Sequence, residues 1–264
     1  MDVPRLRWDL HLHPGSAAER RWADGPGMCA AGRAAGVRGF VWKSHVAHTV
    51  DLCRAAACDD VAAIPSVILN AWTNQREVMT ALEAGGVWLW GPSRDALGAL
   101  SWDLDLPPWW PEVRARLGHL DHHLVVATAH LGRAGRLELA ETAAELESVV
   151  CSITHSLYVD VEEAQQLAGL GCAFELDLFT SAFPIKGRPA RRLEEQAVAL
   201  TGTGATVYLT SDAGQIDTGN PFEFTARQIA LLASRLATST VSAMVETGPE
   251  AIAAWALQRS GTLA

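Results

Sequence analysis

The sequence lacks the continuous apolar stretch that a membrane-spanning helix requires, since no window approaches about 18 consecutive apolar residues. Its first residues also lack the apolar run of a secretory signal, so we expect a cytoplasmic protein without a membrane partner. Basic residues are scarce, 21 against 30 acidic ones. The resulting net charge of −9 disfavours contact with a phosphate backbone, and we expect no nucleic-acid partner.

Cysteine is too sparse and too irregularly spaced to form a framework. The chain has an odd number of cysteines and no C-x-x-C motif: Cys29, Cys53, Cys58, Cys151 and Cys172. This pattern predicts neither a disulfide scaffold nor a zinc ribbon. We interpret all five as buried free thiols.

Short apolar runs, by contrast, recur through the whole chain. Most are nearly continuous in Val, Ile, Leu, Ala and Trp, as in parallel strands covered on both faces. We expect eight strands, at residues 6–13, 37–45, 62–70, 87–91, 123–130, 148–155, 172–179 and 205–212.

Helical patterns separate most of these strands. They cover residues 28–35, 74–84, 137–146, 159–168, 191–200, 221–237 and 248–258. Eight strands alternating with helices in 264 residues predict an α/β fold, a regular or distorted (β/α)₈ TIM barrel. A doubly wound open sheet is the alternative. Because no internal linker is rich in Ser, Gly or Pro, we expect residues 1–264 to form a single domain.

One long segment, residues 92–121, interrupts this alternation after the fourth strand. It is rich in Trp and Pro, and we interpret it as an insertion on the functional face of the barrel, with a short helix at 112–117. Residues 248–258 are an extra C-terminal helix whose apolar stretch, AIAAWAL, permits a homo-oligomer.

Side chains that bind metals or move protons occur at or near the carboxyl ends of the predicted strands. In a barrel these ends meet at one mouth, although the residues are far apart in the sequence. They are His11, His13, Lys43, His45, Asn70, His130, His155, Glu175, Asp177 and Asp212.

The residue types indicate a metal site. Residues i and i+2 of a strand point to the same side, so His11 and His13 can bind one cation. Imidazole and carboxylate ligands suit zinc in the first place, with iron, manganese or nickel as alternatives. Such a metal would lower the pKa of a bound water toward neutrality. Each histidine alone could be an ordinary core residue, but their shared position favours a site.

The pattern resembles the amidohydrolase superfamily of metal-dependent hydrolases, and more closely an uncharacterised bacterial branch related to it. The phrases that carry the resemblance run from the first strand to the last: DLHLHPG, GVRGFVWKSH, VILN, VVATAHL, VCSITH and SDAGQ. Each is short, and their order supplies the specificity.

The resemblance implies roles for these residues. His11, His13 and Asp212 would bind one metal, and Asp212 would accept a proton from the attacking water. His130 and His155 would bind a second metal, or contact the first metal or the substrate. In binuclear members a carboxylated lysine on the fourth strand bridges the metals. Here that strand, VWLWG, has no lysine, and Lys43 ends the second strand instead.

That departure leaves one metal or two open. Lys43 could be a metal ligand, a bridging carbamate or an ammonium group that polarises the substrate. We count Asp212, Lys43 and His155 as the catalytic candidates.

Four further residues are candidates for substrate binding: His45, Asn70, Glu175 and Trp90. Glu175 could equally bind the metal, orient a ligand or form a structural ion pair, and Asn70 could cap a helix. The chain has 10 Trp, five of them in or near the insertion, which suggests a hydrophobic or aromatic small-molecule substrate.

These observations predict a metal-dependent hydrolase that cleaves an amide, cyclic amide or ester bond of a small molecule. The alternatives are a lyase, isomerase, decarboxylase or phosphoesterase on the same barrel, and a non-catalytic binding barrel.

Overall fold

The computed structural model describes residues 3–56 and 58–258, and its strands all run parallel to their neighbours. Each lies inside a range that the apolar pattern predicts. The strands are β1 (Trp8–Leu12), β2 (Gly39–Trp42), β3 (Ala62–Ile64), β4 (Ser66–Ile68), β5 (Trp88–Trp90), β6 (Leu124–Ala127), β7 (Val149–Ile153), β8 (Ala173–Asp177) and β9 (Val207–Thr210).

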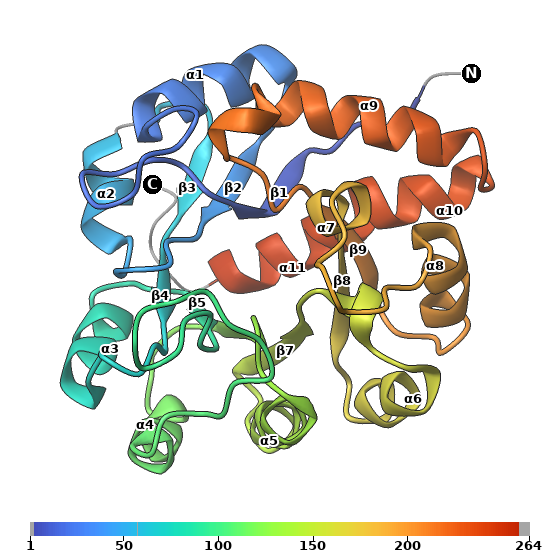
Figure 1. Cartoon of the computed structure of the whole chain (residues 1–264). Helices are drawn as coiled ribbons and strands as arrows, with labels where there is room; N and C mark the ends of the chain where they lie inside the picture. The colour runs from blue at the N-terminus through green and yellow to red at the C-terminus, as the bar shows by residue number, and fades with distance from the viewer. Residues whose placement is uncertain (1–2, 57, 259–264) are drawn as a thin grey trace.

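The strands form a distorted (β/α)₈ barrel, as predicted (Figure 1). One sheet has the order β1-β2-β3 and the other β4-β5-β6-β7-β8-β9. β3 and β4 are the predicted third strand, divided at Pro65, which lacks the amide hydrogen that a ladder needs. An isolated bridge between Leu12 and Ala213 joins the outer edges of the two sheets. The amide of Asp212 donates to the His11 carbonyl there, over 2.9 Å.

Helices surround the strands in Figure 1 and cover their outer faces. They are α1 (Gly25–Ala35), α2 (Val50–Ala56), α3 (Gln75–Glu83), α4 (Trp110–Leu117), α5 (Arg133–Ala144), α6 (Val161–Gly169), α7 (Leu178–Ala182), α8 (Leu193–Thr201), α9 (Pro221–Ala233), α10 (Thr238–Ser242) and α11 (Gly248–Leu257). Two short 3₁₀ helices, η1 (Ser156–Tyr158) and η2 (Ile216–Thr218), and one π-helix, η3 (Ala243–Thr247), complete the described elements.

The C-terminal helix α11 closes one end of the barrel. Ile252, Ala253 and Ala256 pack in the same buried cluster as Trp88 and Tyr208, which lie near the beginnings of their strands. In Figure 1 this helix crosses the ring of strands. The polar side chains at the carboxyl ends of the strands therefore lie at the opposite end of the barrel.

The insertion after β5 lies against the loop that follows β6. Its predicted helix is α4, which begins two residues earlier than expected, with Pro111 in its first turn. Leu104 forms a parallel bridge with Leu131, and the Gly132 amide donates to the Leu104 carbonyl over 2.9 Å. The insertion is thereby held at the mouth of the barrel.

The expectation of five free cysteines is wrong for two of them. Cys29 of α1 and Cys58, after α2, form a disulfide with their Cα atoms 5.8 Å apart. That separation is within the range that a disulfide spans. The two cysteines are 29 residues apart in the sequence, so their spacing gives no sign that they pair. Cys151 and Cys172 are buried free thiols as expected, and Cys53 is a half-buried one.

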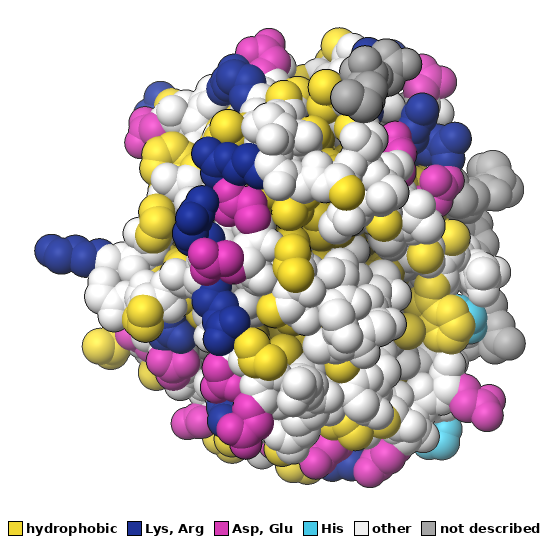
Figure 2. All heavy atoms as spheres, turned by 90° about the vertical axis from the view of Figure 1, so that its right-hand side faces the viewer, with side chains coloured by type: hydrophobic (Ala, Val, Ile, Leu, Met, Phe, Trp, Pro, Cys, Tyr) yellow, Lys and Arg dark blue, Asp and Glu magenta, His cyan; other side chains and the backbone are white. Residues whose placement is uncertain are grey.

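The outer surface mixes charges of both signs. Figure 2 shows basic and acidic side chains alternating along the face on the right of Figure 1, where α8 and α10 lie. Glu194 of α8 pairs there with Arg192 and Arg235. Exposed pairs of this kind contribute about 1 kcal/mol or less. No helix within the described ranges combines the length and the hydrophobicity that a membrane span requires.

Candidate metal centre

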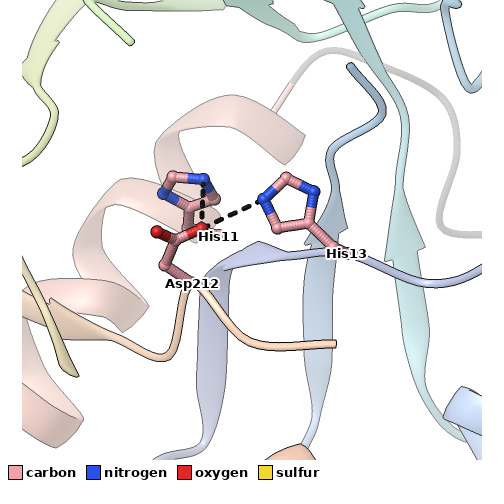
Figure 3. Close-up of side chains that lie close together, drawn as sticks. All are labelled: His11, His13 and Asp212. Atoms are coloured by element: carbon pink, nitrogen blue, oxygen red, sulfur yellow. Dashed lines mark hydrogen bonds and ion pairs between the residues drawn. The ribbon is translucent and has the colours of Figure 1, made fainter. Parts of the chain in front are cut away.

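Three predicted ligands converge from the two edges of the barrel. His11 and His13 come from β1 and the residue after it, and Asp212 follows β9 (Figure 3). Asp212 Oδ1 lies 3.1 Å from His11 Nε2 and 3.0 Å from His13 Nε2. All three side chains are buried. Their candidate ligand atoms lie within 4.8 Å of one another, close enough to share one cation.

Backbone strain is concentrated around this centre. Among the described residues, the non-glycine residues with positive φ are Asp103, Ala129, His155 and Asp212. Two of them are candidate ligands, and Ala129 directly precedes His130. Such conformations cost roughly 1–3 kcal/mol each and persist where the surrounding structure imposes them, which is typical of functional sites.

Lys43 reaches the same point from the end of β2. Its Nζ lies 3.0 Å from His11 Nε2 and 4.4 Å from the centre of the Trp90 ring. The side chain is almost completely buried, and this burial lowers the pKa of Lys43 below its usual value. Lys43 thus supplies an amine that loses its proton more readily than a surface lysine.

Two carboxylates of β8 orient two of the histidines. Glu175 Oε1 lies 2.7 Å from His11 Nδ1, and Asp177 Oδ2 lies 3.0 Å from His155 Nδ1. A neutral histidine that donates from Nδ1 keeps its lone pair on Nε2, where a metal can bind. The Nε2 atom of His155 is buried, and no described residue provides it with a hydrogen-bond partner.

The interior around these side chains contains more buried acidic groups than buried basic ones, and a bound cation would balance them. Asp9, Glu175, Asp177 and Asp212 are buried, whereas Lys43 is the one buried Lys or Arg among the residues that the structure describes. Burial raises the pKa of Glu175 well above its usual range and that of Asp9 to about 6. A divalent cation would offset this unfavourable negative charge. The donor set and the orphaned Nε2 of His155 therefore fit a transition metal.

His155 and His130 lie beside the three converging ligands. The His155 ring centre is 5.5 Å from that of His11, and the His130 ring centre is 5.1 Å from that of His155. His130 donates from Nδ1 to the Ser101 carbonyl over 2.7 Å, and its ring stacks on Trp102 at 3.9 Å. His130 therefore lies farther from Asp212 than His155 does, with the His155 ring next to the converging ligands.

The predicted substrate-binding residues occupy different places. His45 stacks on His13 at 4.6 Å and contacts Ser93 Oγ at 2.8 Å, next to the centre. The amide group of Asn70 bonds the backbone of His45, Ser93 and Arg94, so Asn70 supports these loops.

The remaining two candidates lie inside the barrel. Trp90 is fully buried against Lys43 and His11, and Glu175 contacts His11. Trp90 and Glu175 therefore contact Lys43 and His11 of the metal centre.

Asp177 was expected at the end of its strand but was given no role, although it lies at i+2 from Glu175 and so on the same side of β8. Three other residues at the site were not among the predicted candidates. Glu19 is buried and accepts a hydrogen bond from the His45 amide over 3.0 Å. Trp102 and Arg188 come from two loops that meet only in the folded chain.

The comparisons with known proteins agree with this architecture. Residues 7–102 match the model of DUF6282, a family of unknown function. A search of curated proteins found no match. Three solved structures illustrate the likeness. An ochratoxinase from A. niger has a TM-score of 0.61 and 11% identity, over 97% of this chain and 72% of that chain.

The other two structures cover this chain equally well. A dihydropyrimidinase from Brevibacillus agri has a TM-score of 0.57 and 13% identity, over 98% of this chain and 72% of that chain. An amidohydrolase from Pseudomonas aeruginosa has a TM-score of 0.56 and 11% identity, over 96% of this chain and 97% of that chain. At these identities the likeness shows the fold, and the chain has the fold of the amidohydrolase barrels.

Proposed function

We propose that the protein is a metal-dependent hydrolase that cleaves an amide, cyclic amide or ester bond of a small molecule. The observation that carries the proposal is the convergence of His11, His13 and Asp212, with ligand atoms 3.0 and 3.1 Å apart, at the mouth of a barrel. The amidohydrolase fold supports it, because these side chains lie where such barrels carry their chemistry.

The metal would be held by Nε2 of His11, Nε2 of His13 and the Asp212 carboxylate, with Nε2 of His155 as a fourth ligand. A divalent metal bound there, zinc in the first place, would acidify a water molecule and polarise the carbonyl of the substrate. Lys43, at 3.0 Å from His11 Nε2, would join this shell as a neutral amine or, after reaction with CO₂ and loss of a proton, as a carbamate.

Asp212 moves the proton. In the metal-free protein burial alone would raise the pKa of Asp212, but the hydrogen bond from His13 and the nearby His155 and Lys43 lower it below its usual value. A metal bound at Nε2 of His13 would replace that hydrogen bond, and its positive charge would likewise favour the ionised carboxylate. Asp212 is therefore ionised and can accept a proton from the attacking water. Because its pKa is low, it holds this proton briefly and passes it to the leaving amine or alcohol. Glu175 and Asp177 keep the histidine lone pairs directed at the centre.

The first experiment is metal analysis of protein purified without chelator, before and after reconstitution with zinc, iron, manganese or nickel. We expect close to one equivalent or more of metal, and hydrolysis of at least one amide, cyclic amide or ester in a small-molecule panel. Metal content below about a tenth of an equivalent, with none taken up on reconstitution, would refute the proposal.

The second experiment tests the role of Asp212. Asp212→Asn is expected to lose metal and to lower turnover by at least about a hundredfold. Asp121→Asn is the matched control, because Asp121 is fully exposed and contacts His122, outside this centre. Unchanged metal content and turnover in Asp212→Asn would contradict the mechanism.

A further inference from the structure

Two loops meet above the metal centre through an arginine–carboxylate pair. Asp103 belongs to the insertion after β5, and Arg188 belongs to the segment between α7 and α8. The two terminal nitrogens of the Arg188 guanidinium lie 2.6 and 3.1 Å from the two Asp103 carboxylate oxygens. The guanidinium carbon also lies 5.1 Å from the centre of the Trp102 ring.

Trp102 links this pair to the histidines of the centre. Its ring stacks on His130 at 3.9 Å and meets His155 edge-on at 5.0 Å. The segment around it is held to His130, because the His130 Nδ1 atom lies 2.7 Å from the carbonyl of the preceding Ser101 and the amide of Leu104, two residues further on, donates to the His130 carbonyl over 3.1 Å. The Trp102 ring is thus a fixed wall that contacts both Arg188 and the histidines.

The pairing with Asp103 leaves one hydrogen-bond donor of Arg188 unused. Its side chain is 24% exposed, whereas the Asp103 side chain is 63% exposed and belongs to a residue with a φ of 54°. The Nε atom of Arg188 is buried, and no described residue accepts a hydrogen bond from it. A buried donor without an acceptor is unfavourable, and a carboxylate that binds along the guanidinium edge would satisfy it.

We propose that Arg188, beside Trp102 and the metal centre, recognises a carboxylate group of the substrate. Asp103 holds both terminal nitrogens of the guanidinium when no substrate is bound, and a substrate carboxylate that binds along Nε and one terminal nitrogen displaces Asp103. This inference rests on the proposed hydrolase function and narrows its substrates to small amides or esters that carry a carboxylate. Arg188 is a specificity-determining residue, and the bond-breaking step remains at Asp212.

The test is equilibrium binding, measured by calorimetry on the metal-loaded protein. The probes are 3-phenylpropionate and 3-phenyl-1-propanol, which share a shape and contain no hydrolysable bond. We expect the wild-type protein to bind the acid at least about tenfold more tightly than the alcohol. In Arg188→Gln this preference should vanish, while the affinity for the alcohol changes less than about twofold.

Asp103→Asn gives the decisive result, because Asp103 is an exposed competitor of the substrate. We expect its affinity for the acid to rise at least about threefold, with the affinity for the alcohol unchanged. If the Arg188–Asp103 pair only held the two loops together, Asp103→Asn would bind each probe as tightly as wild type does, or more weakly. Because the change is at an exposed side chain, this test stands even if Arg188→Gln fails to fold.

Arg192→Gln is the matched control, since Arg192 lies nearby in the sequence and is 70% exposed. It should bind both probes like the wild type. Equal affinities of wild type for acid and alcohol, a preference that survives in Arg188→Gln, or no gain in Asp103→Asn would each overturn the proposal. Binding needs no turnover, so an intact preference in a protein without hydrolase activity would refute the proposed function alone.

Discussion

Replacing Glu175 by Gln tests whether the β8 carboxylate prepares His11 for metal binding. Glu175 Oε1 lies 2.7 Å from His11 Nδ1, and both side chains are inaccessible to solvent. A carboxylate in this position makes the opposite nitrogen a better ligand and fixes its direction. The amide of Gln retains an acceptor but loses the charge. We therefore expect the metal affinity of Glu175→Gln to fall by about 10- to 100-fold, or about 1.4 to 2.7 kcal/mol.

The metal-free protein should respond in the opposite direction. Burial raises the pKa of Glu175 well above its usual range, so folding disfavours the ionised form. Wild-type stability should therefore fall as the pH rises from the ordinary pKa of Glu to this raised value. Gln does not titrate, so the variant lacks this loss. At neutral pH, metal-free Glu175→Gln should unfold with a free energy equal to or above that of wild type.

Competition with a chelator of known affinity measures the first effect, and urea unfolding of the metal-free protein measures the second. Glu163→Gln is the matched control, because Glu163 is also buried but pairs with Arg136 on the outer helices. That variant should lose stability and keep its metal affinity. If Glu175→Gln binds metal within about twofold of wild type, or if its metal-free form is clearly less stable, the reasoning about β8 is wrong.

Three further predictions concern other residues around the centre. Burial raises the Asp9 pKa from 3.8 to about 6, so its ionisation should lower wild-type stability by about 3 kcal/mol across that pH interval; urea unfolding of Asp9→Asn should lack this slope. Gly214→Ala should cost about 3 kcal/mol or more in the same assay, because its Cβ would lie 2.2 Å from the His13 carbonyl, whereas Gly36→Ala, at a φ of 74° with open space around it, should cost about 1 kcal/mol. Lys43→Arg should lower metal affinity at least about tenfold and by more than Lys43→Met, because guanidinium stays charged beside His11; an arginine variant that retains wild-type affinity in chelator competition would contradict this.

The sequence was sufficient to predict the barrel because its strands are short, apolar and regularly spaced. Each observed strand lies within its predicted range, and only the division at Pro65 separates nine strands from the eight expected. The same regularity placed His11, His13, Lys43, His155 and Asp212 at strand ends, and the fold brings these side chains together.

The remaining parts of the site depend on contacts that no local pattern encodes. Arg188 and Asp103 are 85 residues apart, and neither belongs to a periodic element that would direct it toward the other. The pairing of Cys29 with Cys58 depends likewise on how α1 packs beside α2. The sequence left several roles open for Glu175. The strand pattern shows which face of β8 Glu175 occupies, but it does not show that His11 lies opposite this face in the barrel.

The position of the two β8 carboxylates also bears on how such a centre can change during evolution. Glu175 and Asp177 are two residues apart, so both lie on the same side of β8. There Glu175 positions His11 and Asp177 positions His155. A shift of the β8 pairing by one residue would turn both carboxylates outward in a single event. An insertion or deletion of one residue within β8, ahead of Glu175, would therefore abolish support for both histidines at once, whereas point substitutions can remove it from each in turn.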